Sequence, residues 1–384
     1  MAPASDHNGK MTSRERVLAA LEHREPDRVP RDLGGTTATG INIVAYHNLV
    51  DYLGLDEEAT LFSERVRLAN LSEAVLTRFK SDARCVMPGG SFGVGEPRGD
   101  GTFVDGYGIV RALPDERGHW YVVGTPLTGE ITRGDITAAA QSWPDPTDPV
   151  YTDGVAERAR ELHQETDCAV ILNLPLGVIH IAQWLRGFEL WLMDLVLDPE
   201  FSIYFLDLLL ERWLEVVRRL LETVGDNVDI LFFAEDIAFH NGSMVSPKTY
   251  LKIIRPYQSR LFRALHDWSD AKLLYHNCGS VTWQIPDMIE WGIDAVNPVQ
   301  VNSDDMGDTA SLKRRFGDEI TFWGAVDTSH ILPHGTPQDV RDEVHRRISD
   351  LGQDGGYVLG TVHNIQAEVS PENICAIWEA ADEV

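Results

Sequence analysis

Short apolar runs alternate with longer amphipathic stretches along the chain from residue 168 onward. The apolar runs are rich in β-branched and aromatic residues, which is typical of buried strands. They read CAVILNLP, DILFFAED, AKLLYHNC, AVNPVQ, ITFWGAVD and GYVLGTVHN. Helical patterns separate or follow them, through residue 223 and over 247–266, 281–291, 336–351 and 371–382. This alternation predicts repeating βα units around a parallel sheet.

Five or six strands are legible in this pattern, so a complete barrel requires earlier strands that the sequence does not show clearly. A doubly wound sheet fits the same alternation, but the glycine-rich phosphate turn that usually accompanies it is missing. We therefore predict an α/β fold of the (β/α)8 TIM-barrel type, for which a chain of 384 residues is long enough.

Two segments lie outside the repeating pattern. Thr12 and Glu15 form the T-x-x-E spacing of a capping box, so an N-terminal helical segment is expected to begin there, after a disordered tail over 1–11. Residues 98–127 alternate β-branched or aromatic residues with glycine- and aspartate-containing turns, which predicts a small antiparallel β insertion. We expect a single barrel domain over 12–384 that carries this insertion.

Acidic residues outnumber basic ones by 60 to 33, which gives a formal net charge of −27. Such a surface repels phosphate backbones and anionic lipid head groups, so neither nucleic acid nor a membrane is an expected partner. The charge otherwise indicates only a well-solvated exterior. The four cysteines are widely spaced and no secretory leader is visible, which indicates reduced thiols and a cytoplasmic protein.

The predicted strand ends carry polar residues where the active site of a βα barrel lies. His276 and Cys278 stand two residues apart, so in extended geometry both side chains point to one face, as two metal ligands from one strand must. His363 ends a late strand, and with an oxygen from Glu235 or Asp236 the set of donors suits Zn²⁺. The alternative for an isolated H-x-C pair is a buried thiol beside a hydrogen-bonded histidine.

Further residues are candidates for chemistry and binding. Glu235 and Asp236 are the candidate catalytic acids, with a helix cap as their structural alternative. The candidate substrate-binding residues are His180, Arg186, Trp323 and Asn364. His180 and Trp323 are also residue types that commonly pack in a core.

Several stretches of the sequence carry a family resemblance. They are MTSRERVLAALEHREPDRVP, LLYHNCGSVTWQIPDMIEWGIDAVNPVQ, FWGAVDTSHILPHGTPQDVRDEVHRRI and GYVLGTVHNIQAEVSPENICAIWEAA. They resemble the uroporphyrinogen decarboxylase superfamily, which comprises the decarboxylase and methyltransferases that serve corrinoid proteins, all on one barrel. The similarity extends over nearly the whole chain.

The resemblance implies a specific ligand set. In the methyltransferase branch a His-x-Cys pair and a later cysteine hold zinc. His276 and Cys278 match the pair, and His363 falls at the position of the third ligand, where it replaces cysteine. The decarboxylase also carries a histidine there, near its substrate and without a metal, so His363 by itself fits either branch.

A stretch near the first strand separates the two branches. The decarboxylase uses an Arg-Gln-Ala-Gly-Arg stretch to hold substrate carboxylates, whereas this chain reads Arg31-Asp32-Leu33-Gly34-Gly35. A porphyrinogen with many carboxylates needs several arginine or lysine donors, and Asp32 beside a single arginine opposes such binding. The sequence therefore favours the methyltransferase branch.

The predicted function is a zinc-dependent methyltransferase with one Zn²⁺ per chain. It would move a methyl group between a small methoxy or related compound and a corrinoid protein or another carrier. The Asp-x-His-x-x-Gly signature of corrinoid proteins does not occur in the chain, so a corrinoid would reside on a separate partner protein. A homodimer is compatible with the sequence. The alternatives are a metal-free decarboxylase or lyase acting on a small carboxylated substrate, and a catalytically silent binding barrel.

Overall fold

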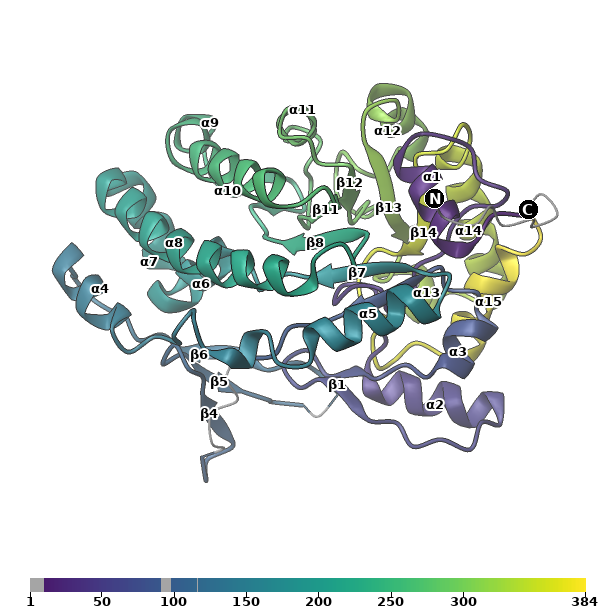
Figure 1. Ribbon diagram of the computed structural model, residues 1–384, viewed down its shortest axis with the longest axis horizontal. Helices are drawn as coiled ribbons and strands as arrows, with labels where there is room; N and C mark the ends of the chain where they lie inside the picture. The colour runs from purple at the N-terminus through teal and green to yellow at the C-terminus, as the bar shows by residue number, and fades with distance from the viewer. Residues whose placement is uncertain (1–9, 91–97, 116) are drawn as a thin grey trace.

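A parallel sheet of seven strands forms the centre of the computed structural model, which describes residues 10–90, 98–115 and 117–384 (Figure 1). The strands lie in the order β14, β13, β12, β11, β8, β7, β3. In chain order they are β3 (Ala83–Val86), β7 (Ala169–Asn173), β8 (Ile230–Ala234), β11 (Lys272–His276), β12 (Ala295–Asn297), β13 (Thr321–Val326) and β14 (Tyr357–Thr361). The predicted parallel βα repeat is confirmed.

Residues 30–33 close this sheet into a barrel between β14 and β3. The nitrogen of Leu359 donates to the carbonyl of Pro30, and the nitrogen of Asp32 donates to the carbonyl of Leu359, each at 2.8 Å. On the other side the nitrogen of Asp82 donates to the carbonyl of Arg31, also at 2.8 Å. The predicted (β/α)8 architecture is therefore confirmed. The early strands were not legible in the sequence because they are short and carry charged residues.

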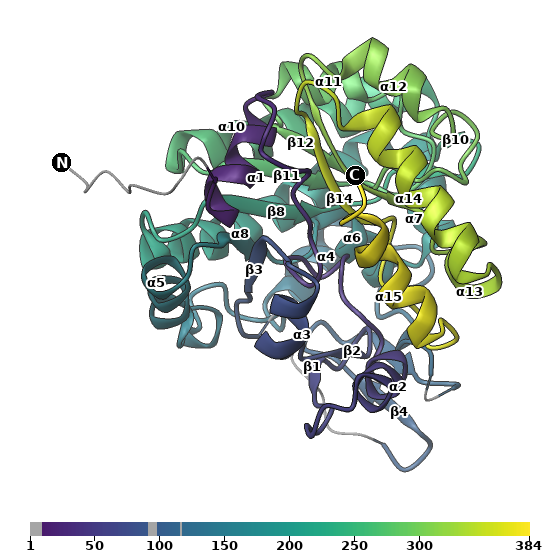
Figure 2. The same ribbon diagram turned by 90° about the vertical axis from the view of Figure 1, so that its right-hand side faces the viewer.

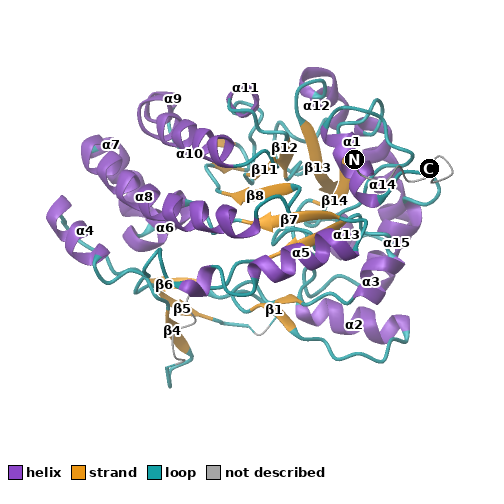
Figure 3. Cartoon of the chain, viewed as in Figure 1, coloured by secondary structure: helices purple, strands orange, loops and turns teal. Residues whose placement is uncertain are grey.

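Helices surround the sheet and follow the strands in turn (Figure 3). They include α5 (Val155–Glu165), α8 (Pro199–Val224), α10 (Arg255–Trp268), α12 (Thr309–Phe316), α14 (Pro337–Leu351) and α15 (Pro371–Ala380). Further helices are α2 (Ile43–Leu53), α3 (Glu73–Arg78), α4 (Arg133–Ala140), α6 (Val178–Arg186), α7 (Phe188–Leu197), α11 (Ile285–Glu290) and α13 (Ile331–His334). None of the helices in the described ranges is both long and apolar enough to cross a membrane.

The helix expected over 247–266 is more complex than the pattern indicated. It begins as α9 (Pro247–Thr249) and passes through a π-helical turn over Tyr250–Ile254 before α10. The helix expected over 281–291 is shorter, because only α11 within that range is helical. The observed helix boundaries therefore differ from those predicted from the apolar periodicity. Such a pattern indicates the buried face of a helix more reliably than its ends.

The N-terminal helix α1 (Ser13–Leu21) begins at the predicted capping box. The Thr12 hydroxyl accepts from the nitrogen of Glu15 at 3.1 Å, and the nitrogen of Thr12 donates to the Glu15 carboxylate at 2.8 Å. Of the tail predicted over 1–11, residues 1–9 lie outside the described residues. Helix α1, purple in Figure 2, packs against β3, β7 and β14.

The insertion over 98–127 contains the predicted antiparallel sheet. Its strands are β4 (Thr102–Val104), β5 (Val110–Ala112) and β6 (Tyr121–Gly124), in the order β4, β5, β6. A second small antiparallel pair, β1 (Leu61–Ser63) with β2 (Leu68–Ala69), lies beside it in Figure 1. The two units are joined by the nitrogen of Trp120, which donates to the carbonyl of Arg65 at 3.0 Å.

The barrel interior is filled by side chains from alternate strand positions, with Trp323 among the largest. The Trp323 indole nitrogen donates to one oxygen of Asp32 at 2.8 Å, and the nitrogen of Gly35 donates to the other at 2.8 Å. Burial raises the pKa of Asp32 to about 6 despite these donors. Trp323, a candidate for the substrate pocket, is instead completely buried in the packed interior.

We predict that Asp32 makes folding pH-dependent. Its pKa is higher in the folded protein than in the unfolded chain, so its contribution to stability is fully present below about pH 4 and is lost as pH rises through about 6. Relative to Asp32→Asn, the unfolding free energy of the wild type should fall by up to about 3 kcal/mol over this window. Urea unfolding at a series of pH values measures the difference, with Asp226→Asn on the surface as control. Parallel pH profiles for wild type and Asp32→Asn would contradict it.

Candidate metal centre

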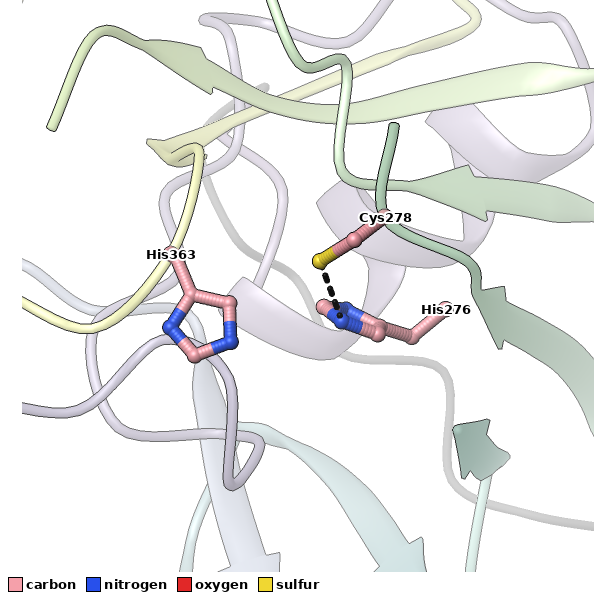
Figure 4. A group of neighbouring side chains, drawn as sticks. All are labelled: His276, Cys278 and His363. Carbon is pink, nitrogen blue, oxygen red and sulfur yellow. Dashed lines mark hydrogen bonds between the residues drawn. The ribbon is translucent and has the colours of Figure 1, made fainter. Parts of the chain in front are cut away.

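Three potential metal ligands converge at the mouth of the barrel (Figure 4). His276 is the last residue of β11, Cys278 follows two residues later, and His363 follows β14. Their donor atoms all lie within 4.8 Å of one another. The sulfur of Cys278 is 3.2 Å from Nε2 of His276, and the two imidazole rings have their centroids 5.5 Å apart. Two nitrogens and one sulfur at this spacing fit the donor chemistry of a zinc ion.

Asn297, at the end of β12, fixes the orientation of His276 through the ring nitrogen that does not face Cys278. The side-chain nitrogen of Asn297 donates to the carbonyl of Trp323 at 3.0 Å, so its oxygen faces Nδ1 of His276, 2.5 Å away. Nδ1 therefore carries the hydrogen and donates to Asn297. This arrangement leaves the lone pair of Nε2 directed toward Cys278, which is how a metal-binding histidine is commonly held.

Burial keeps both histidines neutral. It lowers the pKa of His276, and it lowers the pKa of His363 to about 3, an effect to which a protonated His276 would add by repulsion. Burial also raises the pKa of the Cys278 thiol, and the neighbouring Asp236 carboxylate raises it further. Neutral imidazoles are ready to bind a cation, whereas the thiol ionises here only if a cation compensates its charge.

Asp236 lies within the same group of residues. Its Oδ1 accepts from the nitrogen of Cys278 at 2.7 Å, and its Oδ2 is 3.3 Å from Nε2 of His180. Burial would raise the pKa of Asp236, but the hydrogen bond and charge of His180, the charge of His276 and the Cys278 N–H together hold it well below its usual range. Asp236 is therefore ionised and fixes both His180 and the loop that carries Cys278.

Glu235, the neighbour of Asp236, faces the opposite direction. It accepts hydrogen bonds from the nitrogen of Ile179 at 2.8 Å, the hydroxyl of Tyr257 at 2.8 Å and the side-chain amide of Gln258 at 3.0 Å. It is completely buried, and burial raises its pKa. Its contacts join the start of α6 to α10, so Glu235 holds the wall of the site together.

A cavity of about 120 Å³ lies beside the three ligands. The polar and aromatic residues that line it are Thr37, Arg65, His180, Trp184, Phe232, Asp236, His276, His363 and Asn364. Two hydrogen bonds hold Asn364 against the loop that follows residues 30–33. Its side-chain oxygen accepts from the nitrogen of Gly40 at 2.8 Å, and its side-chain nitrogen donates to the carbonyl of Thr37 at 3.0 Å. The structure thus brings together the predicted residues His180, Asp236 and Asn364 with the predicted ligands.

Besides Glu235, two predicted site residues lie away from the cavity, and three other residues were missed. Arg186 pairs with Asp194 at 2.6 Å and donates to the carbonyls of Leu127 and Gly129, so it anchors the insertion to α6. Trp323 lies in the interior below the cavity. The residues that the sequence did not indicate are Arg65, Trp184 and Asn297, of which only Asn297 had a signal, since it ends a predicted strand.

We predict different roles for the two adjacent carboxylates. Glu235→Ala leaves three buried donors without an acceptor, and the unfolding free energy should fall by about 3 kcal/mol or more. Asp236→Ala should cost less than half as much, because that carboxylate lines the cavity and solvent can replace it. Guanidinium unfolding of both variants provides the measurement. Equal losses of stability would show that Asp236 is as much an anchor as Glu235.

Comparison with known proteins agrees with this architecture. Residues 139–384 match the family model described as uroporphyrinogen decarboxylase (URO-D). A uroporphyrinogen decarboxylase from Pseudoalteromonas translucida is 30% identical over 148 residues, covering 37% of this chain and 39% of that protein. A methylated-thiol–coenzyme M methyltransferase from Methanosarcina mazei is 23% identical over 272 residues, covering 67% of this chain and 65% of that protein. Both alignments span less than two thirds of the relative's length.

A solved structure, a methyltransferase from Methanosarcina mazei, shares the fold with a TM-score of 0.66 and 17% identity, covering 97% of this chain and 99% of that one. The match to the family model confirms the family resemblance found in the sequence. Because the family model matches residues 139–384, well over half of the chain, this protein belongs to the uroporphyrinogen decarboxylase (URO-D) family.

Proposed function

We propose that the protein is a zinc-dependent methyltransferase that moves a methyl group between a small methoxy or related compound and a corrinoid protein or another carrier. The observation that carries this proposal is the convergence of His276, Cys278 and His363 on one point beside a small cavity. The relative from Methanosarcina mazei whose name is a methylated-thiol–coenzyme M methyltransferase supports the class of reaction.

His276, Cys278 and His363 would hold the zinc ion. Zinc in such a site acts as a Lewis acid that polarises a substrate oxygen or ionises a thiol. The second histidine in place of a thiolate leaves the ligand set less negative, which favours the polarisation of oxygen. The residues fit this role because both imidazoles are neutral and Asn297 orients the nitrogen of His276.

His180 and Asp236 supply a proton route in the proposed site. Ionised Asp236 can only accept, so Nε2 of His180 carries the hydrogen between them. Both side chains line the cavity, where the pair can deliver a proton to a leaving oxygen. Of the two predicted acids, ionised Asp236 has no proton to donate, so we assign proton donation to His180 in its protonated form, with Asp236 as its positioning partner, and a positioning function to Glu235 as well.

The size and charge of the cavity argue against a porphyrinogen substrate. At about 120 Å³ it is smaller than pockets that enclose drug-sized ligands, which are roughly 300 Å³ or more. Arg31 does not face it, because its guanidinium is buried against the carbonyl of Trp378 and the carboxylate of Asp382. A small substrate fits this site better than a large polyanion.

A second candidate function is that of a metal-free decarboxylase or another lyase acting on a small carboxylated substrate. The similarity to a uroporphyrinogen decarboxylase at 30% identity favours it. The two candidates differ in their need for zinc and in their product. A decarboxylase would release carbon dioxide after chelation, whereas the proposed methyltransferase would require both its metal and a carrier. That carrier, if a corrinoid, would be bound to a separate protein that docks at the barrel mouth.

We predict that the purified protein binds about one zinc ion per chain and that Cys278→Ala loses it. Cys375→Ala is a matched control, because Cys375 is a buried thiol on α15 that belongs to no ligand group among the described residues. Elemental analysis after gel filtration measures the metal. Absence of zinc from the wild type, or its loss from the Cys375 variant to the same degree, would contradict the assignment.

We further predict that the protein transfers a methyl group to free cob(I)alamin from at least one member of a panel of methyl ethers, methylated thiols and methylamines. The absorption spectrum of methylcobalamin measures the transfer. Asp236→Asn should lower the rate by about 100-fold, because it removes the charge that holds the His180 proton. The variant should retain its zinc. Carbon dioxide release by chelated protein, without methyl transfer to any acceptor, would favour the alternative function.

A further inference from the structure

The end of β12 and the loop after it run beside the segment that carries two of the three candidate ligands. We call residues 297–305 the β12 loop, and residues 276–282 the ligand segment. β11 and β12 are neighbouring parallel strands, and His276 lies opposite Asn297 in their register. Beyond these two residues both segments leave the sheet, but the contacts between them continue as far as Thr282.

The residue before Cys278 is fixed on several sides. The nitrogen of Asn277 donates to the carbonyl of Asn297 at 2.8 Å. The side-chain oxygen of Asn277 accepts from the nitrogen of Ile237 at 3.1 Å, and its side-chain nitrogen donates to Gln284 at 2.7 Å. Asn277 is completely buried, so these bonds leave its backbone little freedom. The chain therefore reaches Cys278 from a fixed point.

The residue after Cys278 is fixed as well, by Gln300 of the β12 loop. The nitrogen of Gly279 donates to Oε1 of Gln300 at 2.6 Å. Gly279 has a φ of +99°, and a Cβ atom there would lie 2.7 Å from the carbonyl oxygen of Phe239, so this close approach requires glycine. The nitrogen of Ser280 donates to the same carbonyl at 2.9 Å. The chain thus leaves Cys278 between two separate segments that both hold it.

Asp305 holds the ligand segment a little further along. Its two carboxylate oxygens accept from the hydroxyls of Ser280 and Thr282. The β12 loop is itself folded back, because the nitrogen of Ser303 donates to the carbonyl of Gln300 at 2.8 Å. Asp305 is exposed to solvent, and exposed groups of this kind usually contribute little to the free energy of unfolding. Its contacts therefore restrain the ligand segment more than they stabilise the whole fold.

Cys278 is the candidate ligand that most needs such restraint. His276 belongs to a strand and is oriented by Asn297, whereas Cys278 lies on a loop beyond that strand. Its sulfur nevertheless faces the ring of His276, as Figure 4 shows. A thiol on a mobile loop loses conformational entropy when it binds a metal, which weakens the binding. A thiol that is already held in place avoids most of this cost.

We propose that Gln300 and Asp305 are positioning residues for Cys278, which hold the ligand segment so that the sulfur faces the two histidines before any metal binds. This inference rests on the proposed function, because the metal of that function gives the placement its purpose. Gln300 and Asp305 are not among the described residues that line the cavity, so neither is expected to touch the substrate. Removal of either side chain should weaken zinc binding and leave the barrel folded.

The first test measures zinc affinity in variants of the β12 loop. Asp305→Ala removes the acceptor of two hydroxyls, and Gln300→Met removes the acceptor of the Gly279 nitrogen but keeps the length of the side chain. Each should raise the zinc Kd by about 10-fold or more, measured by competition with a chromophoric chelator. Because the two variants alter different side chains, failure of one to fold leaves the other as the test.

Asp304→Ala is the matched control. Asp304 is the exposed neighbour of Asp305 and has the same charge, but it contributes its backbone nitrogen rather than its side chain to a bond, with the carbonyl of His240 at 3.0 Å. The control should keep the zinc Kd within about 2-fold of the wild type. Gln300→Glu is the conservative variant, because it retains an acceptor oxygen for the Gly279 nitrogen. It should not weaken zinc binding.

Cobalt(II) in place of zinc reports the sulfur directly, through the thiolate-to-cobalt absorption in the near ultraviolet. At equal concentrations of cobalt and protein this band should weaken in Asp305→Ala and in Gln300→Met. It should be unchanged in Asp304→Ala. A general loss of structure would not distinguish these neighbouring carboxylates.

Hydrogen exchange tests the placement in metal-free protein. The nitrogens of Gly279 and Ser280 are both hydrogen-bonded in the wild type. A peptide covering the ligand segment should therefore exchange about 10-fold faster in Asp305→Ala and in Gln300→Met, measured by mass spectrometry after chelation. A peptide from β8 should exchange as in the wild type, which shows that the barrel is intact.

The two measurements separate this inference from the proposed function. Faster exchange of the ligand segment in both variants but not in the control, in a protein that binds no zinc, supports the positioning role and contradicts the zinc-dependent function. Zinc binding that neither Asp305→Ala nor Gln300→Met weakens, or that Asp304→Ala weakens equally, overturns the inference and leaves the proposed function intact.

Discussion

Closure of the sheet through residues 30–33 is the constraint on which the site depends. β11 and β14 are separated by two strands in the sheet order, so in an open sheet His276 and His363 would be far apart. Hydrogen bonds from Leu359 to Pro30 and from Asp82 to Arg31 bend the sheet into a ring. The carboxyl ends of all strands then surround one mouth of the barrel. Donor atoms at the end of β11 and in the segment after β14 are thereby close enough to hold one metal ion.

Within this ring, burial determines what each charged group can do. Glu235 and Asp236 are adjacent in sequence but have different environments. Glu235 is completely buried and holds three donors from the wall, whereas Asp236 is kept ionised by His180, His276 and the Cys278 nitrogen. The same low polarity keeps His363 neutral and disfavours the Cys278 thiolate unless a cation is bound. The site is thus suited to receive positive charge beside its histidines.

The insertion and the β1–β2 pair give the barrel its specific wall. Members of one fold family differ mainly in the segments that cover the mouth of the barrel, since the barrel itself is fixed by packing. Here Arg65 of the β1–β2 turn and Trp184 of α6 line the cavity beside ligands that come from strand ends, and Arg111 of the insertion packs on the Trp184 ring. The candidate ligands and this part of the cavity wall therefore come from different parts of the chain.

The sequence by itself determined the βα repeat, the start of α1 at Thr12 and the pair of ligands on one face of the strand end at 276–278. These features depend on local periodicity and on spacings of a few residues, which the order of amino acids records directly. The tertiary structure alone decided which carboxylate faces the cavity, that Arg186 and Trp323 lie away from it, and that Arg65 and Asn297 belong to the site. Those outcomes depend on contacts between segments that are distant in sequence, such as Trp120 with Arg65 and His276 with Asn297, and no local pattern records them.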